Sequence, residues 1–428
     1  MSGKHKILVF PAGSEIGLEI YNSLKYSHHV ELFGASGKND HASYVYDESH
    51  YIEDTFYVDR PDFIERFNNL LLRLGIAFVY PTHDTIANFL AAHQDQLAAR
   101  IITSCAQTNQ IARSKSLTYA KFSAFAFCPQ IFSGQDKALT FPVFLKPDDG
   151  QGGKGSYLAS DQAELEFYLH KDPGLLISEF LPGEELSVDC FTDFKGDLKF
   201  IGPRTRERVQ MGISFRSTAI ELSSEIEEIA NTINSTVALN GAWFFQVKKD
   251  RAGKFKLLEF APRQSSTMGL YRAAGINFAL LSLFNALKIP VHIMKNNYAL
   301  QLDRCLHNRY RADFKYFHVY IDLDETLIIG SHVHPMVMAF VYQCRNRGIG
   351  LTLITKHRAD VSASLRDCGI AENLFSAIIH LTEEQPKWQS IKGDGAIFID
   401  NYWHDRLEVA QKLGIPVFDV DAVETLLA

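Results

Sequence analysis

The feature that most constrains the fold of this 428-residue chain is an apolar run that ends in a lysine and is followed by a glycine-rich loop. Val143 to Ser156 read VFLKPDDGQGGKGS, so Lys146 ends the run and Lys154 lies among four glycines. Glycine lets backbone N–H groups approach anionic oxygens, and lysine offsets the charge of a polyphosphate. The order predicts a phosphate-binding loop, although a glycine-rich surface hairpin with two solvated lysines has the same pattern. The stretch matches neither GxxxxGK[ST] nor GxGxxG, so a P-loop or a dinucleotide fingerprint is not supported.

The composition is typical of a soluble protein with two or three domains: 46% of the residues are hydrophobic and 22% are charged. A net charge of -7 gives no support for a nucleic-acid or acidic-membrane partner. The six cysteines form no CxxC pair, which argues against a zinc site and for a reducing compartment. No apolar window is long enough for a membrane span or a signal-peptide core, so we expect a cytoplasmic protein.

Strand and helix patterns alternate near the N-terminus and predict a Rossmann-like parallel sheet, with strands such as Lys6–Phe10 and Ile76–Tyr80. Functional loops then lie at the carboxyl ends of the strands. Gly13 to Glu15 follow one such end, and His83 and Asp84 follow another. For His83 and Asp84, contact with substrate and stabilisation of a helix N-terminus are both open.

Two acidic residues follow the loop along the chain. Glu179 lies within the apolar stretch LLISEFL, and Glu184 follows a Pro-Gly turn. A carboxylate in an apolar strand is costly without a partner. Glu179 therefore either pairs structurally or accepts hydrogen bonds from a ligand, and the nearby glycine loop favours the ligand.

Arg204, Arg206 and Arg208 alternate along a basic stretch. On a strand, this spacing directs all three side chains to one side, where they could bind a carboxylate or phosphate through paired N–H donors. A solvated basic edge strand explains the pattern equally well. Arg204 and Arg206 are the candidates for substrate binding.

A hairpin formed by Trp243–Lys248 and Lys256–Phe260 places Gln246 and Glu259 near the middle of its two arms, where they could lie on one face. A divalent ion that carries nucleotide phosphates needs few protein oxygens, so these two residues are candidate metal ligands. Arg263, just after the hairpin, could meet a transferring phosphoryl group.

The order of these motifs over about the first 300 residues resembles the ATP-grasp superfamily, especially members similar to the large subunit of carbamoyl phosphate synthase. The resemblance implies that ATP phosphorylates a carboxylate and that an amine then displaces phosphate. It implies a Rossmann-like domain over residues 1–110 and an ATP-grasp domain over 111–300. Gln246 and Glu259 would hold Mg²⁺ or Mn²⁺, with Arg263 at the γ-phosphate. The residues implied to contact ATP are Lys115, Lys146, Gly152, Gly153, Lys154, Gly155, Glu179 and Glu184.

Ala261 departs from the usual E-x-N-P-R motif of this superfamily, in which asparagine helps to hold a second metal ion. Alanine offers no side-chain oxygen, so water or substrate would have to fill that position. One alternative to a ligase is therefore a module that binds nucleotide without turnover. A second alternative is a kinase that phosphorylates a small molecule without ligation.

A second set of motifs follows a predicted linker at 301–316. The apolar strand in FHVYIDLDETL ends at Asp322 and Asp324, two residues apart. Alternation places both carboxylates on one side of the strand end, where one can attack phosphorus and the other can move a proton. Two carboxylates this close repel each other unless a cation lies between them, and Mg²⁺ is the natural choice.

Thr355, Lys387 and Asp400 follow these aspartates in an order that resembles the haloacid dehalogenase (HAD) superfamily. The resemblance implies that Asp322 is the nucleophile and Asp324 the general acid/base. Thr355 and Lys387 would bind the phosphoryl oxygens, and Asp400 would bind the metal together with the two aspartates.

Lys392 is a rival for the role of Lys387, and Asn401 or Asp405 would support Asp400. Only about thirty residues separate the first motif from the second and the second from the third. The spacing leaves no room for a cap domain and predicts a capless HAD-like Rossmannoid domain over 317–428.

The whole chain is therefore predicted to be an α/β and α+β multidomain, bifunctional enzyme. One activity is an ATP-dependent carboxylate–amine ligase that acts through an acyl phosphate. The other is a Mg²⁺-dependent phosphatase that acts through an aspartyl-phosphate. The expected partners are a small-molecule carboxylate, an amine and a phosphorylated substrate. The alternative is a phosphatase that carries a nucleotide-binding or kinase module.

Overall fold

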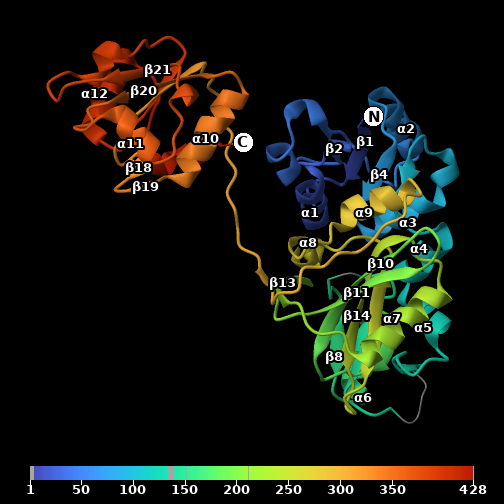
Figure 1. Ribbon diagram of the computed structural model, residues 1–428. Coiled ribbons are helices and arrows are strands. Elements are labelled where there is room, and N and C mark those ends of the chain that lie inside the picture. Colours follow the sequence, from blue (N-terminus) through green and yellow to red (C-terminus); the bar gives the residue numbers. More distant parts are fainter. Residues whose placement is uncertain (1–3, 134–138, 151, 211, 428) are drawn as a thin grey trace. The chain divides into compact units, whose positions relative to one another are not determined.

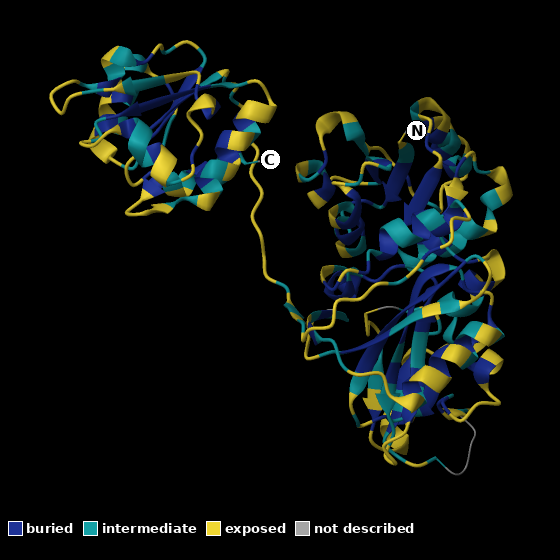
Figure 2. Ribbon diagram, in the orientation of Figure 1, coloured by how far each residue is buried: buried dark blue, intermediate teal, exposed yellow. Residues whose placement is uncertain are grey.

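The computed structural model describes residues 4–133, 139–150, 152–210 and 212–427. Gln151, in the predicted phosphate-binding loop, lies outside the described residues. The chain divides into two compact units, Met1–Leu306 and His307–Ala428 (Figure 1). Buried residues concentrate in the sheets of each unit (Figure 2). Among the described helices, none is both long and apolar enough to cross a membrane.

The first unit begins with a parallel five-stranded sheet in the order β3-β2-β1-β4-β5. Its strands are β1 (His5–Phe10), β2 (Val30–Ser36), β3 (Tyr51–Glu53), β4 (Phe78–Pro81) and β5 (Arg100–Ile101). The helices that follow β1, β3 and β4 are α1 (Glu15–Leu24), α2 (Phe63–Leu74) and α3 (Asp84–Ala92). Alternate residues of β1 face opposite sides of the sheet: Leu8 and Phe10 pack with α2 and α3, whereas Ile7 and Val9 pack with α1.

Helix α9 (Phe278–Ala286) comes from far along the chain but covers the same face of this sheet as α1. Ala279 and Leu283 pack in one cluster with Ile7 and Val9. The hydroxyl of Tyr80 in β4 donates to the Ala279 carbonyl at 2.5 Å. The helix was predicted within the ATP-grasp domain, yet its buried face belongs to the N-terminal sheet.

Two antiparallel sheets and their helices form the middle of the first unit. The smaller has the order β6-β9-β7-β8, from β6 (Ile131–Phe132), β7 (Val143–Lys146), β8 (Tyr157–Ala159) and β9 (Leu176–Glu179). The larger has the order β11-β10-β14-β15, from β10 (Glu185–Thr192), β11 (Leu198–Thr205), β14 (Gly241–Lys249) and β15 (Phe255–Ala261). The helices are α4 (Ala106–Arg113), α5 (Lys115–Phe122), α6 (Gln162–Lys171), α7 (Ser224–Thr236) and α8 (Gly269–Ala273).

A three-stranded sheet completes the first unit with β12 (Arg208–Gln210), β13 (Ile213–Thr218) and β16 (Gln301–Asp303). β16 pairs with β13 through Arg216 opposite Asp303. The residues of β16, Gln301–Asp303, were predicted to begin the linker. The pairing instead makes them part of the first unit, because their backbone groups complete the edge of this sheet.

The second unit contains a parallel sheet in the order β21-β20-β17-β22-β23. Its strands are β17 (His318–Ile321), β20 (Gly350–Thr355), β21 (Ala377–His380), β22 (Ala396–Ile399) and β23 (Val417–Phe418). The helices are α10 (Pro335–Asn346), α11 (Val361–Asp367) and α12 (Trp403–Leu413). Between β17 and α10 the chain forms only the short hairpin of β18 (Ile328–Ile329) and β19 (His332–Val333). The central strands β17, β20 and β22 direct their carboxyl ends to one edge of the sheet.

Candidate active sites

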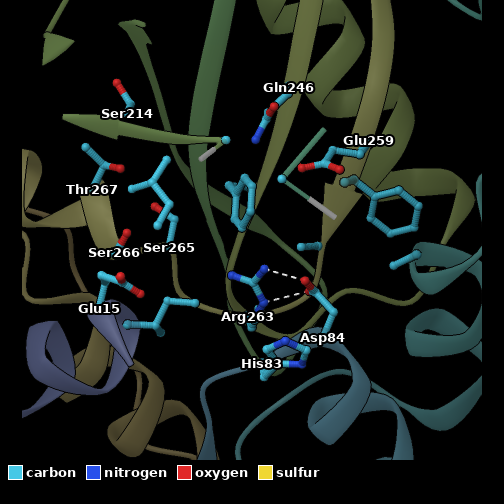
Figure 3. A pocket seen from close by; sticks show the side chains of 18 of the residues that line it. Glu15, His83, Asp84, Ser214, Gln246, Glu259, Arg263, Ser265, Ser266 and Thr267 are labelled. Carbon is cyan, nitrogen blue, oxygen red and sulfur yellow. Dashed lines mark hydrogen bonds and ion pairs between the residues drawn. The ribbon is translucent and has the colours of Figure 1, made fainter. Parts of the chain in front are cut away.

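A cavity of about 350 Å³ lies within the first unit, between the N-terminal parallel sheet and the larger antiparallel sheet (Figure 3). Glu15 enters it from the start of α1, and His83 and Asp84 enter it from the end of β4. Glu259 and Arg263 enter it from β15 and the segment that follows. A neighbouring cavity of about 380 Å³ shares several of its lining residues, so the two form one cleft.

Gln246 and Glu259 are directly opposite each other across β14 and β15, which places both on one face of the sheet, as predicted. Both line the cleft (Figure 3). Neither side chain makes a hydrogen bond to another residue in the described part of the chain. Burial raises the pKa of Glu259, and the charge of Asp84 adds to this effect. The pair thus leaves carboxylate and amide oxygens free beside the cleft.

Two lysines reach the same cleft from different elements. Lys115, at the start of α5, donates to the carbonyls of Asp148 at 3.2 Å and Gly150 at 2.9 Å. Lys146, at the end of β7, is buried and donates to the Tyr119 hydroxyl at 2.5 Å. Burial lowers the pKa of Lys146 to about 8, and the nearby positive charge of Lys115 contributes. The structure therefore brings both predicted lysines to one site.

The glycine loop between β7 and β8 adopts the left-handed backbone that only glycine tolerates easily, with φ of 63° at Gly152, 71° at Gly153 and 72° at Gly155. Lys154 lines the cleft. A Cβ atom at Gly212, in the β12–β13 turn, would lie 2.3 Å from the Gly152 Cα. The loop is therefore in close contact with the turn of the neighbouring hairpin.

The two acids predicted to contact nucleotide have protein partners in the structure. The Gln130 amide donates to the Glu179 carboxylate at 2.8 Å, and Lys249 is 2.9 Å from Glu184 at an exposed position. Glu185, the next residue, lines the cleft instead and lies 2.7 Å from Arg206. Sequence reasoning did not select Glu185. Its place directly after Glu184, at the start of β10, was the available signal.

The three alternating arginines do not act as one set, and the expectation that they point the same way is wrong. Arg204 is buried and forms a bidentate pair with Asp189, at 2.7 and 3.1 Å. Arg208 forms an ion pair with Asp303 at 2.5 Å, and neither residue lines the cleft. β11 ends at Thr205 and β12 begins at Arg208, so Arg206 lies outside both strands and the alternation of a single strand does not continue through it. Arg204 and Arg206 do line the cleft.

Arg263 and Asp84 form a bidentate ion pair in the cleft, with both nitrogen–oxygen distances at 2.6 Å (Figure 3). Burial would raise the pKa of Asp84, but the Arg263 guanidinium outweighs burial and lowers it. His83 accepts a hydrogen bond from the Thr85 amide at the start of α3, and burial lowers the pKa of its imidazole. The two residues begin α3, as one of the two interpretations predicted, and they also line the cleft. Their contact with substrate stays a prediction.

In the second unit, Lys387 lies among three carboxylates at the carboxyl edge of the parallel sheet. Its ammonium nitrogen is 2.8 Å from Asp322, 2.6 Å from Asp400 and 3.4 Å from Asp405. Burial raises the pKa of Asp322 to about 6, although Lys387 opposes this effect. Lys392, the rival lysine, makes no ion pair with a carboxylate of the described residues.

Asp324 points to a different partner from Asp322. Its carboxylate lies 2.8 Å from Nδ1 of His357, whose Nε2 is 2.8 Å from the Ser364 hydroxyl. Thr355, at the end of β20, accepts a hydrogen bond from the His357 amide at 3.2 Å. Sequence reasoning missed His357, which could have been found from its place two residues after Thr355 at a strand end.

No group of three or more His, Cys, Asp or Glu residues is arranged as a metal site in the described ranges. Asp322, Asp400 and Asp405 carry three negative charges, whereas Lys387 and the neighbouring Lys356 carry two positive charges. One negative charge is left over at a largely buried edge. This balance fits a divalent cation held by Asp322 and Asp400.

A family model described as "ATP-grasp in the biosynthetic pathway with Ter operon" matches residues 171–303, wholly within the first unit. The carbamoyl phosphate synthase large chain of Clostridium beijerinckii is 26% identical over 147 residues, which cover 31% of this chain and 14% of that protein. The arginine-specific large chain of Bacillus subtilis is 26% identical over 175 residues, which cover 38% of this chain and 17% of that protein. The chain thus spans a small part of the curated relatives it matches.

Solved structures agree over a larger share of the chain. The biotin carboxylase domain of Hydrogenobacter thermophilus 2-oxoglutarate carboxylase, with MgADP, ADP and bicarbonate, has a TM-score of 0.56 at 16% identity and covers 70% of this chain and 74% of that chain. The chain carries the ATP-grasp fold. The L-amino acid ligase of Bacillus licheniformis has a TM-score of 0.53 at 16% identity, over 68% and 76% of the two chains. Staphylococcus aureus N5-carboxyaminoimidazole synthetase with ADP has a TM-score of 0.56 at 14% identity, over 68% and 78%.

Within this ATP-grasp fold, Ala261 lines the cleft two residues after Glu259. It is buried at the end of β15 and offers only a methyl group. Arg263, two residues further on, forms an ion pair with Asp84. On β14 and β15, the side-chain oxygens that line this edge are therefore those of Gln246 and Glu259.

Proposed function

We propose that the first unit is an ATP-dependent carboxylate–amine ligase that acts through an acyl phosphate. The observation that carries this proposal is the cross-strand pair of Gln246 and Glu259 in a cleft that Lys115 and the glycine loop also line. Free oxygens beside cations suit a metal-bound polyphosphate. The solved structures of the same fold that contain ADP, in one case as its magnesium salt, support ATP and Mg²⁺ as the cofactors.

Glu259 fits a magnesium ion because it is a carboxylate with a raised pKa and no hydrogen-bond donor among the described residues. A cation would relieve the cost of keeping this carboxylate charged. Gln246 adds a neutral oxygen on the same face. The ion would offset charge on the phosphates during transfer.

In the proposed reaction, a carboxylate oxygen of the acid attacks the γ-phosphorus of ATP, and the bond to the β–γ bridging oxygen breaks to release ADP. The amine then attacks the acyl carbon, phosphate leaves and the nitrogen loses a proton. Lys115 and Lys146 would offset charge on the phosphates, and Arg263 would meet the transferred phosphoryl group. The glycine loop would supply backbone N–H groups, and Glu185 is the acid of this region that lines the cleft, whereas Glu179 and Glu184 have protein partners.

For the second unit we propose a phosphatase of the HAD type, which would use Mg²⁺ and an open site without a cap. Lys387 between Asp322 and Asp400 carries this proposal, because it holds the two acids at the edge where the central strands end. Asp322 would attack phosphorus while Asp324 gives a proton to the leaving alcohol. Water would then hydrolyse the aspartyl-phosphate, with Asp324 taking back a proton. Thr355 would donate to a phosphoryl oxygen.

Release of ADP tests the ligase proposal in protein that carries Asp322→Asn, which silences the proposed phosphatase. The protein is mixed with ATP, Mg²⁺ and pooled carboxylates and amines, beside the same protein with Glu259→Ala. The matched control is Glu221→Ala, an exposed acid outside the cleft-lining set. We expect the pools to stimulate ADP release, Glu259→Ala to abolish it and Glu221→Ala to leave it unchanged.

The same assay separates the alternatives. ADP release that needs one co-substrate and no amine would identify a kinase. ATP binding without ADP release in any pool would favour a nucleotide-binding module beside the phosphatase. For the second unit, release of phosphate from p-nitrophenyl phosphate with Mg²⁺ should disappear in Asp322→Asn and persist in Glu259→Ala.

A further inference from the structure

The cleft has two chemically different ends, and the proposed ATP chemistry uses only one of them. Gln246 and Glu259 lie at one end (Figure 3). At the other end lie Ser265, Ser266 and Thr267, with Glu15 beside them (Figure 3). Hydroxyl groups that converge on a cavity bind and orient polar ligands. The hydroxyl end therefore needs a ligand of its own.

Arg204 gives this end a fixed donor that the protein does not use. The side chain is 1% exposed, and its Nε and one terminal nitrogen donate to Asp189 at 2.7 and 3.1 Å. The same terminal nitrogen is 3.2 Å from the Ser265 hydroxyl. The other terminal nitrogen has no hydrogen-bond partner among the described residues. Buried N–H groups are almost always paired, so this donor points to an acceptor that a ligand brings.

A second guanidinium lies beside Ser266, although it is not among the residues that line the cleft. Arg304 is 3.2 Å from the Ser266 hydroxyl. Burial lowers the pKa of Arg304, and Arg204 is near enough to contribute to the lowering. Glu15 opposes that effect and is the acid of this end that lines the cleft. Two donors and one acceptor match a ligand with an oxyanion and an ammonium group.

Resting on the proposed ligase, we propose that the hydroxyl end binds the carboxylate of an amino acid, which is the amine substrate of the reaction. Arg204 and Ser266 would donate to the carboxylate, Arg304 would add positive charge beside Ser266, and Glu15 would accept from the ammonium before it loses a proton. Arg204 is already neutralised by Asp189, so the site suits a singly charged carboxylate better than a doubly charged phosphate ester. The amine is therefore neither ammonia nor a simple alkylamine.

Matched amines test this assignment in the full chain with ATP, Mg²⁺ and pooled carboxylates. The probes are individual L-amino acids, their carboxamides, 2-aminoethyl phosphate and ammonium chloride, and the readouts are ADP and the mass of the amide. We expect the free amino acids to exceed their carboxamides by about tenfold to a hundredfold in kcat/KM. Equal rates for acid and carboxamide, or a preference for ammonium or for the phosphate ester, would overturn the assignment.

Two variants tie the preference to the hydroxyl end. Arg204→Lys keeps a positive charge beside Asp189 but removes the unpaired N–H, so the preference for the free acid should fall by about tenfold. Ser266→Ala leaves the Arg204–Asp189 pair intact, so it tests the same subsite if Arg204→Lys does not fold. Arg208→Lys, whose partner is Asp303 outside the cleft-lining set, is the control. A preference that survives both Arg204→Lys and Ser266→Ala would overturn the subsite.

Failure of the ligase proposal gives a different result. ADP release with an acid alone, together with no amide product from any amine, would contradict both the ligase proposal and the subsite proposal. Amide formation with alkylamines but with none of the amino acids would contradict the subsite proposal and leave the ligase proposal intact.

Discussion

Asp84 and Arg263 join two parts of the first unit that are far apart in sequence. The Asp84 carboxylate, at the start of α3, accepts two hydrogen bonds of 2.6 Å from the Arg263 guanidinium, which follows β15. The side chains are 25% and 12% exposed, so solvent screens the pair little. The pair fixes Arg263 at the edge of the cleft, above the ring of Phe244. Asp84 therefore determines where the arginine points.

Replacing Asp84 by Asn should destabilise the first unit and slow ADP release. A largely buried guanidinium without its carboxylate costs about 3 kcal/mol, and an unrestrained Arg263 should lower kcat about tenfold with little change in the KM for ATP. Urea unfolding and steady-state kinetics measure the two effects. The control, Asp62→Asn, breaks an exposed pair with Arg60 and should change the stability little. A normal kcat in Asp84→Asn would contradict the positioning role.

Nucleotide binding should take up protons above neutral pH because of Lys146. Its pKa of about 8 lies below the ordinary value of 10.5, so much of the side chain is neutral at pH 8.5. A polyphosphate would raise this pKa again and draw a proton from solvent. At pH 6.5 the lysine is already charged, and uptake should vanish. Calorimetry in buffers of different ionisation enthalpy measures the uptake.

The matched variants for this experiment are Lys146→Met, which should remove the uptake, and Lys121→Met, an exposed lysine on α5 that should not. Proton release, or uptake that persists in Lys146→Met, would contradict the assignment to Lys146.

Asp322 should make the second unit less stable as the pH rises from about 4 to about 6. Its folded-state pKa of about 6 exceeds the ordinary 3.8, so the folded state holds the proton more tightly than the unfolded state does. For this group, stability is highest below pH 4, falls between pH 4 and pH 6, and is constant above that range. Asp322→Asn removes the charge and should stabilise the unit at pH 7 by about 2 kcal/mol.

Hydrogen exchange of the β17 amides as a function of pH measures this effect locally. Asp394→Asn changes an exposed acid of the same unit and is the control. If Asp322→Asn left the pH dependence unchanged between 4 and 6, another group would be responsible.

His357 should orient Asp324 for proton transfer. The imidazole holds the Asp324 carboxylate through Nδ1 and is itself held by Ser364 through Nε2. His357→Ala frees the carboxylate, so kcat for p-nitrophenyl phosphate should fall about tenfold while KM changes little. His404→Ala, an exposed histidine on α12, is the control. A change in KM alone would show that His357 contacts substrate rather than positioning Asp324.

Sequence patterns predicted well those parts of the molecule that depend on local periodicity. The apolar run before Asp322 forms β17, and the hairpin with Gln246 opposite Glu259 forms as expected. Contacts across long sequence separations were not predictable. The Arg263–Asp84 pair spans 179 positions, and no local pattern reports such a distance. The prediction for the three arginines failed because the regular strand is interrupted between Thr205 and Arg208.

The packing of α9 on β1 also determines how the first unit can be divided. A fragment that ends near residue 110 would keep Ile7 and Val9 but lose Ala279 and Leu283, which cover them. Its exposed apolar face would favour aggregation. The N-terminal sheet is therefore not a detachable module: a shortened chain meant to fold alone has to continue through at least Ala286, and a transplanted N-terminal sheet needs its own copy of α9.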